Sequence, residues 1–258
     1  MPRVLPLALA LAALLPPSAP LAAAPSSSLL TVAAAASLKP PLEELRQAFQ
    51  AGHPGVRVAV SYGASGVFLA QIQGGAPFDL FLSADVDYPR QAVAAGLARA
   101  GDVAVFAVGR LCLWLPAGAP LDLRGRGLFA LADPRIRRVA IANPAVAPFG
   151  RAAEAALRAA GLLEAVRPKL VMGQSVAQAA GFAAGGAVDA ALVPLSLAQE
   201  PALATGAALP LEGAEARLPQ AAAVLVGARD PSLARAFLDF VRGPTGRDAF
   251  RRHGYELP

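Results

Sequence analysis

The sequence predicts an α/β protein with two lobes, and three observations support this fold class. Apolar runs of strand length alternate with stretches in which apolar residues recur at helical spacing. Short loops that contain glycine or serine connect strands to the helices that follow them. The same alternation begins again after residue 115, and a chain of 258 residues is long enough for two small lobes.

The first unit is predicted to contain three strand–helix pairs followed by two further strands. Its first helix should begin at Ser37 as the N-cap, because two prolines follow in what would be the first turn. Leu42, Leu45 and Phe49 would form the apolar face of that helix. The expected elements are a strand over 29–34, the helix from Ser37, a strand over 55–61, a helix after the loop 63–66, a strand over 79–82, a helix over 88–95, and strands over 103–108 and 111–115.

The second unit repeats this organisation and ends with two helices. Ser175 and Asp230 each stand where a helix N-cap is expected, and Gly161 is expected to end a helix. The expected elements are a strand over 138–141, a loop over 147–150, a helix over 151–160, a strand over 169–172, a helix from Ser175, strands over 190–193 and 220–226, and helices from Asp230 to Arg242 and from Thr245 to Gly254.

Residues 1–24 have the pattern of a secretory signal peptide. A charged Arg3 precedes an apolar stretch and then a zone of small residues. The uninterrupted apolar core, residues 7–15, is too short for a bilayer that needs about 20 residues. We therefore expect export to the periplasm with cleavage of this peptide, and no transmembrane anchor.

Composition and charge exclude several classes of protein. A hydrophobic content of 55% supports a sizeable core and argues against disorder. The net charge of +5 is scattered, and the densest cluster, at 135–138, lacks interleaved aromatic residues. That cluster is interpreted as a solvated face, and no nucleic-acid partner is expected. Cys112, the one cysteine of the chain, lies in an apolar run and is interpreted as a buried structural thiol.

Nothing in the sequence indicates catalysis. The two histidines, His53 and His253, lie in polar surroundings, and the chain has no metal-ligand spacing, nucleophile elbow or phosphate-binding loop. Asp79 and Asp85 flank a predicted strand, and Asp85 is best interpreted as a helix cap. We therefore predict that the protein is not an enzyme and has no cofactor.

The strand-to-helix junctions are the features that could bind a ligand. Four of them, at 35–38, 61–66, 148–151 and 173–176, place backbone N–H groups at the start of a predicted helix, and Ser37 and Ser65 add hydroxyl groups. Helix N-termini attract anions because their N–H groups are unpaired and the helix dipole is positive there. Each junction taken alone is more simply a cap or a turn.

At these junctions the chain resembles the molybdate-binding proteins of bacterial ABC importers. The resemblance covers nearly the whole chain after the signal peptide. Five stretches carry it, in the same order along the chain: 34–38 (AAASL), 61–72 (SYGASGVFLAQI), 75–85 (GAPFDLFLSAD), 143–153 (NPAVAPFGRAA) and 237–255.

The resemblance implies a type II periplasmic-binding-protein fold with a hinge and a ligand cleft between the lobes. The ligand would be molybdate or tungstate, with molybdenum bound as its oxyanion and no metal ligated directly. Carried over, Ser37 and Ser65 would give hydroxyl and N–H contacts, and Phe149 and Val176 backbone N–H groups. The fifth position is Pro194, where many members have a tyrosine hydroxyl.

Two departures from the family's pattern concern this site. Pro194 has neither a hydroxyl nor an N–H group, and Ser196 is a candidate substitute. Gly66 stands where a hydroxyl residue is common beside Ser65. These departures bear on the affinity and on the choice of anion.

The resemblance also implies a division of the chain and a set of partners. We expect one lobe at 28–108 plus 222–258 and the other at 109–221, with the hinge near Val108 and Val224. The partners would be the small oxyanion and a membrane permease, and the protein would be a monomer. The alternatives are a protein for sulfate or another small oxyanion, an exported α/β hydrolase, or a scaffold module without a small ligand.

Overall fold

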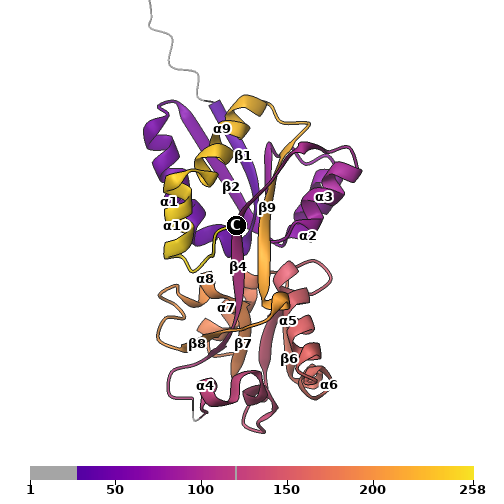
Figure 1. Ribbon diagram of the computed structural model, residues 1–258, viewed down its shortest axis with the longest axis vertical. Helices are drawn as coiled ribbons and strands as arrows, with labels where there is room; N and C mark the ends of the chain where they lie inside the picture. The colour runs from indigo at the N-terminus through magenta and orange to yellow at the C-terminus, as the bar shows by residue number, and fades with distance from the viewer. Residues whose placement is uncertain (1–27, 120) are drawn as a thin grey trace, which may run out of the picture.

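The computed structural model describes residues 28–119 and 121–258, which form two α/β lobes one above the other (Figure 1). Two long strands, β4 (Ala98–Leu115) and β9 (Arg217–Leu225), pass between the lobes. The predicted signal peptide, residues 1–24, lies outside the described residues. Within the described ranges, no helix has the length and apolar character needed to cross a bilayer.

The first lobe is built on three parallel strands. It contains β1 (Ser28–Ala35), η1 (Ala36–Leu38), α1 (Lys39–Gly52), β2 (Val56–Gly63), α2 (Ser65–Gln73), β3 (Leu80–Ser83), α3 (Asp87–Ala94), α9 (Pro231–Arg242) and α10 (Pro244–Arg252). β1 is the central strand and pairs in parallel with both β2 and β3. Helices α1, α9 and α10 cover one side of this sheet, and α2 and α3 cover the other (Figure 1).

The second lobe repeats the parallel arrangement with shorter elements. It contains α4 (Leu123–Arg126), η2 (Gly127–Ala132), β5 (Val139–Ala142), α5 (Pro148–Ala159), α6 (Leu163–Val166), η3 (Arg167–Lys169), β6 (Leu170–Gly173), α7 (Val176–Ala184), β7 (Ala190–Pro194), α8 (Leu195–Ala198), β8 (Ala207–Pro210) and η4 (Ala214–Ala216). β5 pairs in parallel with β6 and β7. In both lobes the carboxyl ends of the parallel strands therefore lead into helices.

The crossing strands join both lobes into one mixed sheet of order β2-β1-β3-β9-β4-β7-β5-β6, with β8 on β4. β9 pairs antiparallel with β3, and β4 pairs antiparallel with β7. The prediction of two strands over 103–108 and 111–115 is wrong, because β4 runs through Gly109 without a break. A Cβ atom at Gly109 would lie 2.8 Å from Gln220 Nε2 and 2.9 Å from Phe149 Cζ, so glycine serves close packing there and not a turn.

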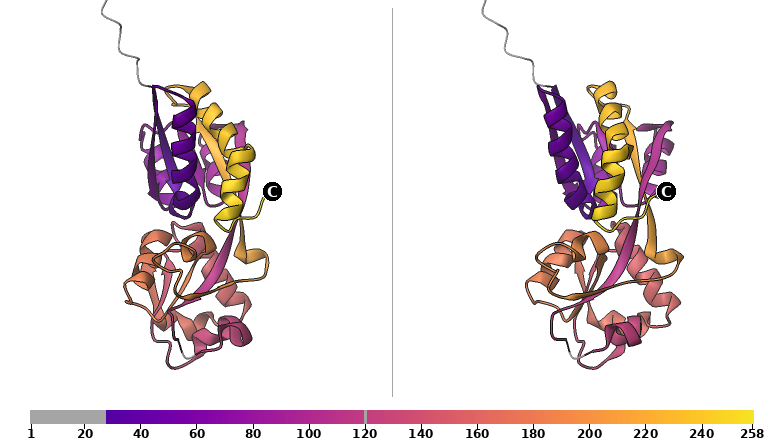
Figure 2. Two further views of the ribbon diagram at one scale, coloured as in Figure 1. Left: turned by 90° about the vertical axis from the view of Figure 1, so that its left-hand side faces the viewer. Right: turned by 60° about the vertical axis from the view of Figure 1, so that its left-hand side comes forward.

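The end of the chain is fastened to the crossing strands. Glu256 and Val108 exchange backbone hydrogen bonds of 2.7 and 2.9 Å. The Glu256 carboxylate accepts a hydrogen bond of 2.6 Å from Arg110 on β4 and pairs with Arg217 on β9. Figure 2 shows the C-terminus beside these strands, at the level where the lobes meet.

Helix prediction from the sequence is largely confirmed. Leu42, Leu45 and Phe49 on α1 are at most 1% exposed. Ser175 caps α7 by accepting a hydrogen bond from Gln178 N, and the Asp230 carboxylate caps α9. These caps satisfy N–H groups that the helices leave unpaired.

A buried carboxylate fixes the edge of the first lobe that lies away from the second. The Asp79 side chain is 2% exposed and accepts hydrogen bonds from Thr31 and Arg229. Burial alone would raise the pKa of this carboxyl, but the hydrogen bonds from Arg229 and Thr31 outweigh it and lower the pKa to about 2. Asp79 precedes β3 and so lies at the amino end of the strand, away from the helix starts of the predicted site.

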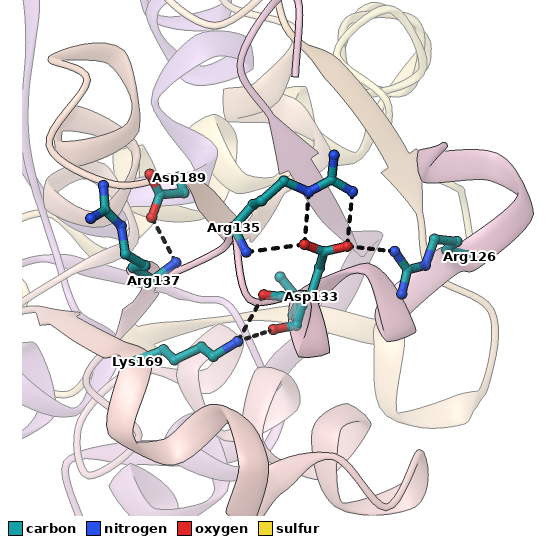
Figure 3. A network of polar contacts seen from close by, with 7 residues as sticks. Arg126, Asp133, Arg135, Arg137, Lys169 and Asp189 are labelled. Carbon is teal, nitrogen blue, oxygen red and sulfur yellow. Dashed lines mark hydrogen bonds and ion pairs between the residues drawn. The ribbon is translucent and has the colours of Figure 1, made fainter. Parts of the chain in front are cut away.

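Polar contacts fix the connection from η2 to β5 in the second lobe (Figure 3). Asp133 accepts hydrogen bonds from Arg135 and Arg126, which hold the pKa of its carboxyl well below its usual range. Lys169 donates to the carbonyl of Asp133, and Asp189 accepts from the backbone of Arg137. The arginines of the cluster at 135–138 are exposed, which confirms their interpretation as a solvated face.

Candidate functional site

A small cavity lies between the two lobes, and the predicted junctions line it. The first lobe contributes the end of β1 with η1, the start of α2 and the residue after β3, and the second lobe contributes the starts of α5 and α7. Its lining residues are Ala35, Ala36, Ser37, Gly63, Ala64, Ser65, Ala84, Ala147, Pro148, Phe149 and Val176. The volume is about 10 Å³, close to the lower limit for one water molecule. Groups from both lobes therefore converge on one small space.

Ser37 brings a buried hydroxyl group that no protein group satisfies. It is 0% exposed, and its Oγ has no hydrogen-bond partner among the described residues. The prediction that Ser37 caps the first helix is wrong, because α1 has Leu38 as its N-cap residue and Ser37 lies in the preceding 3₁₀ turn. A buried polar atom without a partner costs about 1–3 kcal/mol, and a ligand acceptor in the cavity would remove this cost.

Ser65 presents its hydroxyl group from the first turn of α2. It is also 0% exposed, and its Oγ accepts a hydrogen bond of 3.1 Å from Ala84 N. The oxygen is thereby fixed in place while the hydroxyl hydrogen is left to donate. Ser65 is therefore suited to donate to a ligand that is rich in acceptors.

Phe149 and Val176 bring two helix N-termini of the second lobe to the cavity. Phe149 is the second residue of α5 and Val176 is the first residue of α7. N–H groups at these positions have no acceptor within their own helices, and the positive end of each helix dipole lies there. The loop predicted over 147–150 is wrong, because α5 begins at Pro148, a residue whose fixed φ suits the first helical position.

Pro194 is not among the residues that line the cavity. It ends β7 and pairs with Leu111 on β4. Ser196, the candidate substitute, turns its hydroxyl group elsewhere and donates to the carbonyl oxygen of Ser37 at 2.9 Å. The Tyr255 hydroxyl group donates to the same oxygen at 2.6 Å. Both hydroxyl groups therefore hold the backbone of Ser37, a residue that lines the cavity.

The rim of the cavity carries further contacts between the lobes. Arg151 on α5 donates to the Asp85 carboxylate and, at 2.9 Å, to the Tyr88 hydroxyl oxygen. Gly66 N donates to Val146 O at 2.9 Å. Asp85 does not stand at the N-cap position of α3, but its Oδ1 accepts a hydrogen bond from Tyr88 N, so it serves the first turn from one residue earlier.

The lining of the cavity is electrically neutral. It contains no lysine, arginine, histidine or carboxylate side chain, and its donors are hydroxyl and N–H groups. Such donors suit a compact anion without the cost of burying a second charge. In the described part of the chain, no group of three or more histidine, cysteine, aspartate or glutamate residues could hold a metal ion.

Cys112 and the histidines lie apart from the cavity. Cys112 is buried in β4 and donates to Val193 O, and burial raises the pKa of its thiol to about 12, in agreement with a structural role. His53 contacts the carbonyl oxygen of Phe49, and His253 lies beside Glu44.

Comparison with known proteins identifies the family. Residues 30–256 match the family model of bacterial extracellular solute-binding proteins. The molybdate-binding protein of Azotobacter vinelandii is 35% identical over 86% of this chain and 87% of its own length. The molybdate-binding protein of Rhodobacter capsulatus is 35% identical over 85% of each chain. This chain belongs to the molybdate-binding family of extracellular solute-binding proteins.

Solved structures agree with this assignment to the molybdate-binding family. The periplasmic molybdate-binding protein of Azotobacter vinelandii superposes with a TM-score of 0.81 at 31% identity, over 89% of this chain and 99% of that one. The sulfate-binding protein SubI of Mycobacterium tuberculosis shares the fold, with a TM-score of 0.75 at 20% identity, over 89% of this chain and 87% of that one. The fold is therefore the two-lobed type II periplasmic-binding-protein fold, and the family consists of solute-binding proteins, not enzymes.

Proposed function

We propose that this protein captures molybdate or tungstate between its lobes and delivers it to the membrane permease of an ABC importer. The observation that carries the proposal is the buried hydroxyl group of Ser37, which has no hydrogen-bond partner among the described residues and belongs to a residue that lines a small neutral cavity together with three helix N-termini. A tetrahedral dianion offers acceptors in all directions, so it matches donors that converge from both lobes. The relatives with this name are 35% identical over most of the chain.

The proposed ligand contacts are the hydroxyl groups of Ser37 and Ser65 and the N–H groups of Phe149 and Val176. Pro194 is not among the residues that line the cavity, so we do not include it as a contact. Ser196 and Tyr255 do not contact the anion in this proposal. They hold Ser37 in position through hydrogen bonds to its carbonyl oxygen. Sulfate would use the same donors, and we propose that cavity size discriminates against it, because its shorter bonds would leave its oxygen atoms farther from donors spaced for molybdate.

We propose that one lobe comprises residues 28–108 plus 220–258 and the other residues 109–219, which moves the expected boundary two residues earlier because Ala221 pairs with Ser83 of the first lobe. On β4 the hinge would lie at Val108, as the sequence suggested. On β9 we propose the hinge near Pro219, the residue opposite Val108, because Val224 pairs with Leu80 inside the first lobe. Closure would exclude water and strengthen each hydrogen bond to the anion.

We further propose that the protein acts as a monomer in the periplasm after cleavage of residues 1–24. Mass spectrometry of the protein recovered from the periplasm tests the cleavage, and light scattering tests the monomer. A chain retained in the cytoplasm with its N-terminus intact would contradict this part of the proposal.

Calorimetric titration of the ligand-stripped protein tests the function. Molybdate, tungstate, sulfate and phosphate are added separately, and the proposal expects one-to-one binding of molybdate and tungstate with no heat from sulfate. Binding of sulfate alone would overturn the choice of cargo. An absence of binding for all four anions would overturn the proposed function.

A further inference from the structure

Arg151 and Asp85 form a contact across the mouth of the cavity. Arg151 follows Phe149 by two residues on α5 of the second lobe, and Asp85 directly follows Ala84, which lines the cavity in the first lobe. The guanidinium group pairs with the Asp85 carboxylate, donates to the Tyr88 hydroxyl oxygen and lies 4.9 Å from the centre of the Tyr88 ring. All three contacts join one lobe to the other.

The two sides of this contact are held differently. The Asp85 side chain is 14% exposed and is fixed within its own lobe by hydrogen bonds from the Ser83 hydroxyl and Tyr88 N. The Arg151 side chain is 42% exposed, and among the described residues its polar contacts are those to Asp85 and Tyr88. Separation of the lobes would leave Asp85 with the partners of its own lobe, whereas Arg151 would lose both of these contacts beside the helix start that carries Phe149.

We propose that Arg151 has two roles in the capture cycle, attracting the anion to the open cleft and then latching the closed lobes through Asp85 and Tyr88. This inference rests on the proposed function of the same site. A positive charge at a cleft raises the association rate of an anion. After closure Asp85 neutralises that charge, so the bound anion is held by hydrogen bonds and not by a fixed cation.

Gly66 makes the latch possible because it has no side chain. Its N–H group donates to Val146 O across the cleft, and a Cβ atom there would lie 2.5 Å from the Tyr88 hydroxyl oxygen and 2.9 Å from Val146 O. A substitution at Gly66 would therefore hold the lobes apart at this rim. Such a substitution would weaken the contact of Arg151 with Asp85 and Tyr88 without changing any charge.

Stopped-flow kinetics of molybdate binding, at low and high salt, separate the two roles. Arg151→Gln should lower the association rate about three- to tenfold at low salt and weaken its salt dependence. The same variant should raise the dissociation rate about two- to fivefold, as expected for loss of a partly exposed ion pair. Arg151→Lys should restore the association rate but not the dissociation rate, because lysine keeps the charge without the planar fork.

Asp85→Asn should not lower the association rate, in contrast to Arg151→Gln. Removal of the negative charge should leave the association rate unchanged or higher, while the dissociation rate rises as in Arg151→Gln. Gly66→Ala should raise the dissociation rate alone. Arg158→Gln, an exposed arginine farther along the same helix, is the matched control and should change neither rate.

Each outcome of this experiment supports or overturns the inference. Rates of Arg151→Gln that equal those of Arg158→Gln, in a wild-type protein that binds molybdate, would overturn the latch and leave the proposed function intact. An association rate that falls in Asp85→Asn as well would overturn the attraction role. A wild-type protein that binds none of molybdate, tungstate and sulfate would overturn the proposed function and the inference with it.

Discussion

Replacement of Ser37 by alanine should lower the affinity for the anion without lowering the stability of the protein. The Ser37 hydroxyl is 0% exposed and has no hydrogen-bond partner among the described residues, so its loss removes no hydrogen bond to another protein group. The free energy of unfolding without ligand should therefore stay the same or rise by up to about 1–3 kcal/mol, the cost of an unsatisfied buried polar group. Binding should weaken by about 1–3 kcal/mol, or about 5- to 150-fold in Kd.

Two measurements on each variant test the expected effects on stability and on affinity. Urea unfolding without ligand gives the stability, and calorimetry with molybdate gives the Kd. Ser65→Ala should lose affinity to a similar extent but also lose stability, because Ala84 N would be left without its acceptor. Ser232→Ala, an exposed serine on α9, is the control for both assays. A Ser37→Ala protein that is less stable and binds molybdate as tightly as wild type would refute the reasoning.

Three further predictions follow from the structure. Val176→Pro should weaken binding about 5- to 150-fold without loss of helicity by circular dichroism, because proline fits the first position of a helix but lacks the N–H donor. An unchanged Kd would contradict this prediction. Tyr255→Phe should weaken binding several-fold, measured by calorimetry, because the Ser37 carbonyl loses a hydrogen bond of 2.6 Å that holds the site; affinity equal to wild type would exclude this positioning role. Asp79, whose folded pKa of about 2 lies below its ordinary value, should contribute stability of about 2 kcal/mol that is present above about pH 4 and is lost as the pH falls towards 2. In Asp79→Asn that part of the acid dependence of urea unfolding should disappear, and an unchanged pH profile would contradict the assignment.

The order of the longer strands and helices could be predicted because local signals determine it, whereas the four-residue elements α4, α6, α8 and β8 were not predicted. Apolar periodicity and the caps at Ser175 and Asp230 are properties of neighbouring residues, and the structure confirms them. The break predicted within β4 failed for a non-local reason. Gly109 has the appearance of a turn residue in the sequence, but it is required because Gln220 and Phe149 pack against it from distant parts of the chain.

The cavity could be anticipated at the level of its junctions but not of its contacts. Ser37, Ser65, Phe149 and Val176 each lie at a strand-to-helix junction, which the sequence displays, and they meet because parallel strands share one carboxyl edge. The role of Ser37 was misjudged, because a serine before a helix is ordinarily its cap. Only the three-dimensional structure reveals that the hydroxyl is left free.

The contacts around the cavity have no signal in the local sequence. Arg151 and Asp85 are 66 residues apart, and Tyr255 and Ser37 are 218 residues apart. Both pairs arise from the way the two lobes and the chain end come together at the crossing strands. A single sequence shows which residue types are present, but it does not show which distant residues contact one another.

The most direct test of the central claim is a crystal structure of the protein grown with tungstate, with anomalous differences recorded at the tungsten edge. The account predicts one strong anomalous peak between the lobes, with oxygen atoms within hydrogen-bond distance of the Ser37 and Ser65 hydroxyl groups and of the N–H groups of Phe149 and Val176. A principal peak elsewhere on the molecule, or a cleft without tungsten in a protein that binds tungstate in solution, would contradict it.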